Sequence, residues 1–146
     1  MIRVFLDANV YFAGFVSKEG ASFLILDLAR RKKLTLLASR LVLREADRNL
    51  RKKSSSATLK VFRRYLQNTK IHMIQIPDEK IFEPYAPYIH PKDLPVSAAA
   101  VESKADFFIT LDKRHFLAPH VLSKVKKVKI LTSADFIREV YLKGKI

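Results

Sequence analysis

Four acidic residues stand where a strand is expected to end or a helix to begin: Asp7, Glu45, Asp93 and Asp112. Asp7 follows the apolar segment Ile2–Leu6, and Asp112 comes shortly after the apolar segment Phe107–Thr110. A carboxylate at the carboxyl end of a buried strand contributes little to stability, because burial penalises its charge. The same position suits a divalent cation, since hard cations prefer carboxylate oxygens. The pattern therefore predicts metal-dependent chemistry, and the basic composition points to a phosphate-rich polymer as the substrate.

Three of these acids also have a structural alternative. Asp7 is placed equally well to cap the helix that follows the first strand. Glu45 borders the apolar face of its expected helix, although most helical glutamates are solvated. Asp93 precedes a proline-containing helix start and fits an N-cap, yet a cap at this edge can also bind metal. Asp112 has no such explanation, whereas Asp106 begins its strand, belongs to the opposite edge of the sheet and is interpreted as structural.

Other chemistries fit the sequence less well. The three glycines are scattered and form no phosphate-binding loop, and no serine lies in a nucleophile elbow. Cysteine is absent, which excludes disulfides, thiol catalysis and cysteine-ligated zinc. A phosphorylated aspartate would suit Asp7, but haloacid-type phosphatases need a second acid where this chain has Asn9. By type Asn9 suits a turn, and it could also orient Asp7 or bind a metal-bound water. The histidines lack zinc-ligand spacing and are interpreted as surface residues: His72, His90, His115 and His120.

Alternating strands and helices are expected to position the acids. The segments expected as strands are apolar and short: Ile2–Leu6, Leu34–Ala38, Ile71–Ile76, Asp106–Thr110 and Val128–Leu131. Helices are expected between and after them: at Ala21–Arg31, from a Ser39 cap to about Asn49, at Ala57–Thr69, from an Asp93 cap through Lys104, and from a Ser133 cap to Tyr141. The proline-rich stretch from Pro77 to Pro95 is expected to be loop or short helical turns.

This alternation predicts an α/β fold in which three layers, α/β/α, enclose a central parallel sheet of four to five strands. Residues 1–146 are expected to form a single domain, because the chain is too short for two comfortable ones. In such a sheet a ligand binds beyond the carboxyl ends of the strands, where the strand order reverses. If the first and fourth strands are neighbours, the carboxylates of Asp7 and Asp112 meet at that edge.

The charge of the chain is strongly positive. Lys and Arg number 28 against 14 Asp and Glu, for a net charge of +14. A domain this basic attracts polyanions, although the same charge also keeps a surface soluble. No apolar run approaches the roughly 20 residues that span a bilayer, and Met1–Leu6 lacks the basic start of a secretory signal, so a cytoplasmic location without membrane contact is expected.

Four motifs together resemble a PIN domain, the ribonuclease family typified by VapC toxins of prokaryotic toxin–antitoxin pairs. They are Val4-Phe-Leu-Asp-Ala-Asn-Val10, Ser39 followed by Glu45, Asp93 followed by Ala98-Ala99, and Thr110-Leu-Asp-Lys-Arg-His-Phe116. The likeness runs through most of the chain in the order of the family. The chain departs from the family at Ala8, where a small hydroxyl residue is usual, and at Pro95, which follows Asp93 closely.

The resemblance implies a Mg²⁺- or Mn²⁺-dependent endoribonuclease with Asp7, Glu45, Asp93 and Asp112 as its acids. Asp7, Asp93 and Asp112 are then expected to be direct metal ligands, while Glu45 ligates through water or acts as a general base. Asn9 and Thr110 are expected to assist them, and Lys92 and Lys113 to hold the RNA backbone. The resemblance further implies an antitoxin partner and a homodimer.

The basic composition leaves an alternative from another class of function. The chain would then be a nucleic-acid-binding module without catalysis, and the acids would serve as helix caps and solubility residues. Cleavage of RNA in the presence of Mn²⁺, and its loss with EDTA, distinguishes the two hypotheses.

Overall fold

A parallel sheet lies at the centre of the computed structural model, which describes residues 1–75, 79–112, 114–115, 119–125 and 127–146. In these residues the strands are β1 (Arg3–Leu6), β2 (Thr35–Ser39), β3 (Ile71–Ile74), β4 (Phe107–Ile109) and β5 (Lys129–Leu131). They form one five-stranded sheet in the order β3-β2-β1-β4-β5, and every pairing is parallel. The predicted central parallel sheet is therefore confirmed.

The strand order reverses beside β1. The chain moves outward from β1 through β2 to β3, and then returns to place β4 on the other side of β1. Leu6 is level with Ile109 in the β1–β4 pair, and the backbone N–H of Asp7 donates to the Ile109 carbonyl at 2.9 Å. The residues that follow β1 and β4 consequently meet at one edge, as the sequence predicted on the condition that these strands are neighbours.

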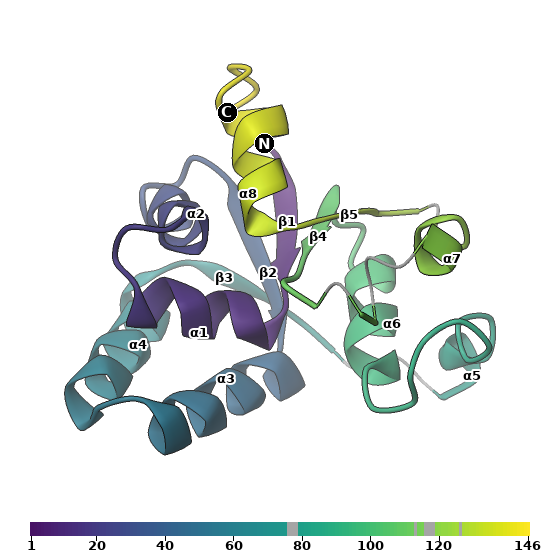
Figure 1. Cartoon of the computed structure of the whole chain (residues 1–146), viewed down its shortest axis with the longest axis horizontal. Coiled ribbons are helices and arrows are strands. Elements are labelled where there is room, and N and C mark those ends of the chain that lie inside the picture. Colours follow the sequence, from purple (N-terminus) through teal and green to yellow (C-terminus); the bar gives the residue numbers. More distant parts are fainter. Residues whose placement is uncertain (76–78, 113, 116–118, 126) are drawn as a thin grey trace.

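Helices cover both faces of this sheet (Figure 1). One group gathers on one side: α1 (Ala8–Val16), α2 (Ala21–Arg30), α3 (Arg40–Lys53) and α4 (Ser56–Asn68). The other side carries α5 (Glu79–Phe82), α6 (Leu94–Glu102) and α7 (Pro119–Leu122). The chain ends in α8 (Ser133–Phe136) and the π-helical η1 (Ile137–Tyr141), with α8 packed on α2. Within the described residues, no helix is both long enough and apolar enough to cross a bilayer.

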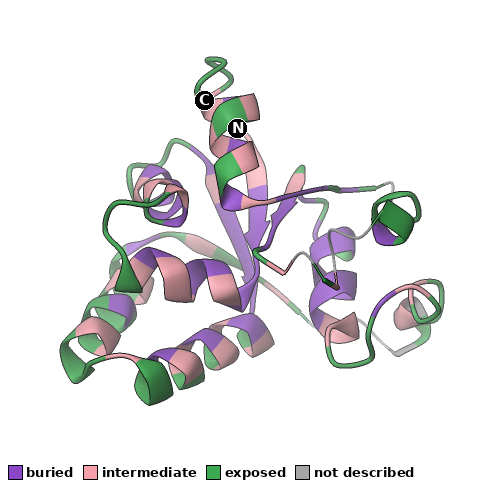
Figure 2. Ribbon diagram, in the orientation of Figure 1, coloured by how far each residue is buried: buried purple, intermediate pink, exposed green. Residues whose placement is uncertain are grey.

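Apolar strands and small helical residues hold the layers together (Figure 2). Val4, Phe5 and Leu6 of β1 are fully buried, and the Phe5 ring meets the Phe108 ring of β4 edge to face at 5.9 Å. In α6 the buried residues Ala98–Ala100 carry only a methyl group, which lets this helix approach the sheet closely. The close packing of α6 therefore follows from its composition.

Polar residues begin several of the helices. The Ser39 hydroxyl accepts from the Val42 N–H at 3.3 Å, which confirms Ser39 as the N-cap of α3. The prediction that Ser133 caps the last helix is wrong, because Thr132 makes the capping bond, from the Asp135 N–H at 3.1 Å. Ser133 is buried, and its hydroxyl lies 2.8 Å from that of Ser22 on α2.

The ends of one helix and one strand differ from the sequence prediction, by about four residues in α3 and by two in β3. Helix α3 continues to Lys53, past the expected end near Asn49, since Arg51, Lys52 and Lys53 suit the negative end of a helix dipole. Strand β3 ends at Ile74, before the expected Ile76, which lies outside the described residues. Because β3 is at the edge of the sheet, only β2 supports it by pairing.

Candidate metal centre

Asp7 lies at the carboxyl end of β1 and is buried, with 9% of its surface exposed. Its Oδ1 accepts from the Ala8 N–H at 2.8 Å, so the residue caps α1. Its Oδ2 accepts from the Thr110 hydroxyl, also at 2.8 Å. The capping role that the sequence left open is therefore present, and it occupies one of the two carboxylate oxygens.

Thr110 forms hydrogen bonds to the residues that follow both β1 and β4. Its fully buried hydroxyl donates to Asp7 and accepts from the Asp112 N–H at 3.0 Å. Asn9, which lies in α1, places its Nδ2 3.4 Å from the same hydroxyl and accepts from the Leu111 N–H at 3.1 Å. Asn9 is thus not the turn residue that its type suggested, but a bridge from α1 to the segment after β4.

Asp112 organises the turn after β4. Its Oδ1 accepts from the Arg114 N–H at 3.1 Å and from the His115 N–H at 3.0 Å. Its Oδ2 lies 2.9 Å from the imidazole Nδ1 of His115. The residue that lacked a structural explanation in the sequence therefore has one, since one oxygen fixes the turn. The other oxygen points to the neighbouring side chains of the cluster.

Asp93 joins this cluster from the start of α6. It occupies the N-cap position, but its side chain makes no capping hydrogen bond. Its Oδ2 instead lies 2.7 Å from His115 Nδ1. The carbonyl of Asp93 accepts from the Ser97 N–H and hydroxyl, so the backbone is anchored while the carboxylate remains available. The cap alternative for this carboxylate is thus not what the structure shows.

The pKa of Asp7 shows that Glu45 lies within electrostatic range of it. Burial, above all, raises the pKa of Asp7 from 3.8 to about 6, and the Thr110 hydroxyl and Ala8 N–H oppose that rise. The charges of Glu45 and Asp93 raise the pKa of Asp7 further, which places both acids within electrostatic range of it. Glu45 is half-buried on α3. Glu45 and Asp93 therefore lie within electrostatic range of Asp7, whereas Asp93 and Asp112 meet at His115.

The other residues singled out in the sequence have separate positions. Asp106 lies at the opposite edge of the sheet, where its Oδ2 accepts from the Arg3 N–H at 2.8 Å, so its structural interpretation is confirmed. Lys92 is exposed beside Asp93, and Lys113 lies outside the described residues. His115 was interpreted as a surface residue, which is wrong, because its ring is part of the cluster. Its position three residues after Asp112, in a turn rather than a helix, was the one available signal.

The donor atoms of this cluster fit a divalent cation. Oxygen or nitrogen atoms of Asp93, Asp112 and His115 all lie within 4.8 Å of one another. Asp93 Oδ2 and His115 Nδ1 are buried and have no hydrogen-bond partner among the described residues, despite their separation of 2.7 Å. Oxygen and nitrogen atoms that lie this close together without a hydrogen bond are suited to bind a metal ion. Carboxylates in particular suit hard divalent ions.

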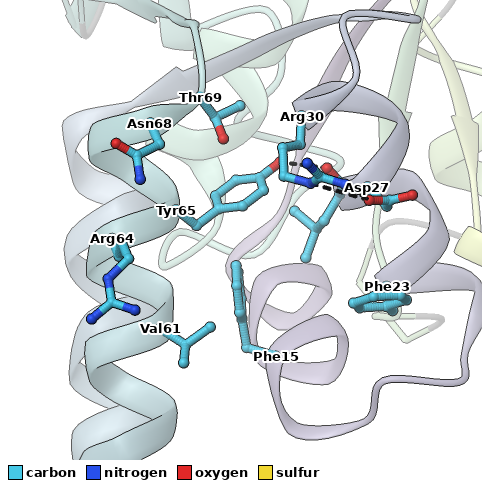
Figure 3. A pocket seen from close by; sticks show the side chains of 10 residues that line it. Phe15, Phe23, Asp27, Arg30, Val61, Arg64, Tyr65, Asn68 and Thr69 are labelled. Atoms are coloured by element: carbon cyan, nitrogen blue, oxygen red, sulfur yellow. Dashed lines mark hydrogen bonds and ion pairs between the residues drawn. The ribbon is translucent and has the colours of Figure 1, made fainter.

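An apolar hollow lies elsewhere, between α1, α2 and α4 (Figure 3). The rings of Phe15 and Tyr65 meet edge to face across it at 5.2 Å, and the Tyr65 hydroxyl donates to the Leu26 carbonyl at 2.7 Å. Phe23 and Val61 line the hollow with 38% and 48% of their surfaces exposed. The acids of the cluster take no part in it, so this surface is separate from the candidate metal centre.

Comparison with known proteins agrees with this fold. The sequence model of the PIN domain matches residues 3–114, and the chain therefore belongs to the PIN domain family. A chain of VapBC2 from Rickettsia felis, bound to a DNA fragment from its promoter, aligns with a TM-score of 0.61 at 15% identity. That alignment covers 90% of this chain and 98% of the other.

A second solved structure, DNA-bound VapBC from Salmonella typhimurium, gives a TM-score of 0.64 at 15% identity. This alignment covers 91% of this chain and 99% of the other. A search of curated proteins gave no match. The two structural likenesses confirm the three-layer α/β/α fold.

Proposed function

We propose that this protein is a metal-dependent endoribonuclease that hydrolyses RNA phosphodiester bonds. The observation that best supports the proposal is the close group of Asp93, Asp112 and His115 in a chain of net charge +14, with Asp7 and Asp93, and Asp7 and Glu45, within electrostatic range of each other. A negatively charged site in a positively charged body suits a cation and a polyanion at the same time. Membership of the PIN domain family, whose members are generally nucleases, supports the proposal.

The acids have two roles in this proposal: some are ligands of the cation, and one can act as a general base. Asp93 and Asp112 would hold Mg²⁺ or Mn²⁺ with the oxygens that lie beside His115. Asp7, whose two oxygens accept hydrogen bonds from Ala8 and Thr110, would be the third ligand. When bound, the cation lowers the pKa of a water molecule and offsets charge that builds on the phosphate. Glu45, on the neighbouring helix, ligates through water or accepts the proton. Thr110 holds the Asp7 carboxylate by a hydrogen bond, and Asn9 holds the segment after β4 through the Leu111 N–H.

Basic side chains near the acids hold the RNA backbone. Lys92 precedes Asp93 directly and is exposed to solvent, and Lys113 follows Asp112 in the sequence. Each phosphate contact of this kind releases counterions from the RNA, so binding weakens as salt rises. The affinity for RNA is consequently expected to fall steeply between low and physiological salt.

Cleavage of RNA by the purified chain tests the proposed activity. We expect cleavage with Mn²⁺ or Mg²⁺, none with EDTA, and a loss of at least about 100-fold in Asp112→Asn, since removing a group that stabilises the reacting phosphate costs this much. Asp106→Asn is the matched control, because this acid lies at the opposite edge of the sheet. RNA binding without metal-dependent cleavage in the unmodified protein would instead support the non-catalytic binding module.

A protein partner of the antitoxin kind is the second part of the proposal. The two structural neighbours are VapBC assemblies, and the hollow between α1, α2 and α4 exposes apolar side chains of a kind that marks interaction surfaces. With the protein encoded by a neighbouring gene as the candidate inhibitor, Val61→Asp is expected to relieve inhibition without changing cleavage. Gln67→Asp, an exposed position on the same helix outside the hollow, is the control.

Homodimerisation stays a prediction that rests on the family likeness. Sedimentation equilibrium of the purified chain measures it directly: a mass twice that of the 16.8 kDa chain would support a dimer.

A further inference from the structure

The imidazole of His115 lies between two of the acids. Its Nδ1 is 2.7 Å from Asp93 Oδ2 and 2.9 Å from Asp112 Oδ2. Despite these separations, Nδ1 and Asp93 Oδ2 have no hydrogen-bond partner among the described residues, and both atoms are shielded from solvent. One ring nitrogen is thus directed into a space that two carboxylate oxygens share.

These separations resemble those between ligands of one ion. Two ligand atoms on adjacent octahedral positions lie roughly 3 Å apart when each bond to the ion is about 2.1 Å long. A simple histidine–aspartate pair would align one N–H with one oxygen at a favourable angle. Here Nδ1 is nearly equidistant from two oxygens, which is the arrangement expected when three lone pairs converge on a common centre.

Neighbouring groups fix the orientation of the ring. The backbone N–H of His115 donates to Asp112 Oδ1 at 3.0 Å, which ties the residue to the turn after β4. The ring stacks on that of His90, with centroids 5.1 Å apart and planes 19° apart. His90 is itself held, since its Nδ1 accepts from the Lys92 N–H at 3.2 Å. His90 therefore positions the ring of His115 without directing a nitrogen into the cluster.

We propose that His115 Nδ1 is a protein ligand of the same cation as Asp93 and Asp112, and that it makes the site select Mn²⁺ over Mg²⁺. The inference rests on the proposed function, because it concerns the cation of that site. Mg²⁺ is a hard ion that strongly prefers oxygen, whereas imidazole nitrogen is a ligand for transition-metal ions. An imidazole added to the carboxylates of this site thus favours a divalent transition-metal ion when both kinds compete.

Pulsed electron paramagnetic resonance of Mn²⁺ bound to the full chain tests the ligand directly. We expect a coupling from a directly bound ¹⁴N nucleus in the unmodified protein. Labelling the histidines with ¹⁵N should replace it by a ¹⁵N coupling, and His115→Gln should abolish it. The ¹⁵N-labelling experiment requires no substitution. It therefore shows whether a histidine nitrogen binds the ion even if the His115→Gln variant folds poorly.

Competition between the two ions tests the selectivity. We expect His115→Gln to weaken Mn²⁺ binding by about 10-fold or more, the size of effect that even supporting residues of metal sites have. Mg²⁺ binding should change much less, so the preference for Mn²⁺ falls. His72→Gln is the matched control, because His72 is exposed on the edge strand β3 and lies outside the cluster.

Bound Mn²⁺ without a nitrogen coupling, or an unchanged ion preference in His115→Gln, would overturn the inference and leave the nuclease proposal intact. Failure of the unmodified protein to bind any divalent ion would overturn both. RNA cleavage with either ion, measured on the same preparation, separates these two results.

Discussion

Asp7 has a structural role as the cap of α1 and a proposed chemical role as a ligand of the cation. One oxygen caps α1 and the other accepts from Thr110, yet the carboxylate is buried next to further acids. Burial raises the pKa of Asp7 to about 6, which means that its ionised form is costly in the metal-free protein. A bound cation would offset that cost, because opposite charge favours the ionised carboxylate.

Asp7→Asn is expected to abolish cleavage while it stabilises the metal-free fold near neutral pH. The pKa of Asp7 is 3.8 in the unfolded chain and about 6 in the folded one, so within this window the folded protein binds the extra proton. Stability therefore falls as pH rises through the window, and the ionised carboxylate costs at most about 3 kcal/mol above it. Asparagine does not ionise and escapes this cost.

Urea unfolding of the metal-free protein at pH 4 and pH 7.5 measures the effect. The gain from Asp7→Asn should be present at pH 7.5 and small at pH 4. A loss of stability at pH 7.5 would contradict the account and favour the cap as the main role of Asp7. Asp106→Asn should show no such gain, since that acid accepts a hydrogen bond from the Arg3 N–H at the opposite edge.

Thr110→Val tests the hydrogen bonds that the Thr110 hydroxyl makes to Asp7 and Asp112. Valine keeps the shape but removes the hydroxyl, which leaves the Asp112 N–H without its acceptor and costs about 1–3 kcal/mol of stability. We expect cleavage to fall about 10- to 100-fold because supporting residues have effects of this size. Thr110→Ser retains the hydroxyl and should keep most of the activity. A loss in Thr110→Ser as large as that in Thr110→Val, or larger, would contradict this account, because serine retains the hydroxyl.

The sequence identified the acids of the cluster but not its histidine. Asp7 and Asp112 could be predicted because strand ends are visible as breaks in apolar segments. His115 lies in a turn, where no periodicity links a residue to one face, so its approach to Asp93 depends on tertiary structure. Asn9 was expected to assist the acids, but its bond to Leu111 could not be predicted for the same reason, because Leu111 is far away in the sequence.

At the scale of elements, α3 presents a face rich in arginine, which also carries Asp47 in an ion pair with Arg63. Glu45 borders the site, whereas four exposed arginines recur at intervals of three or four residues along the solvent side and line one groove: Arg40, Arg44, Arg48 and Arg51. Residues at this spacing share a helix face. The groove is therefore a basic surface suited to the backbone of an RNA strand.

The double substitution Arg44→Gln/Arg48→Gln is expected to weaken RNA binding. Each lost phosphate contact lowers the salt dependence of single-strand binding by about 0.7 in the log–log slope, so two contacts lower it by about 1.4. Fluorescence anisotropy with a labelled single-stranded RNA in EDTA measures the slope without cleavage. The double variant Lys143→Gln/Lys145→Gln, near the C-terminus, removes the same charge as a control. Identical slopes in the two variants would contradict a specific role for α3.

Element types followed from the sequence more readily than their arrangement. Apolar strands and capped helices are local properties, and the Ser39 cap is confirmed for that reason. The adjacency of β1 and β4 is not local, because their pairing depends on the return of the chain across the sheet. The last helix was misassigned by one residue, since Thr132 and Ser133 are equally suitable caps by type.

For the molecule as a whole, apolar residues from β1 to the last helical segment belong to one core. This core includes Val4 near the start of the chain and Val140 near its end. We therefore predict that residues 1–146 unfold as a single domain in one cooperative transition. Differential scanning calorimetry checks this prediction: the calorimetric and van't Hoff enthalpies should agree. Two resolved transitions would contradict it.

The location of a bound ion tests the central claim, that the acids at the sheet edge form a cation site within a basic protein. Crystals of the full chain soaked in Mn²⁺ and measured at the manganese absorption edge would reveal it. The account predicts an anomalous peak among Asp7, Asp93 and Asp112. Fully occupied manganese at other positions, with none beside these carboxylates, would contradict it.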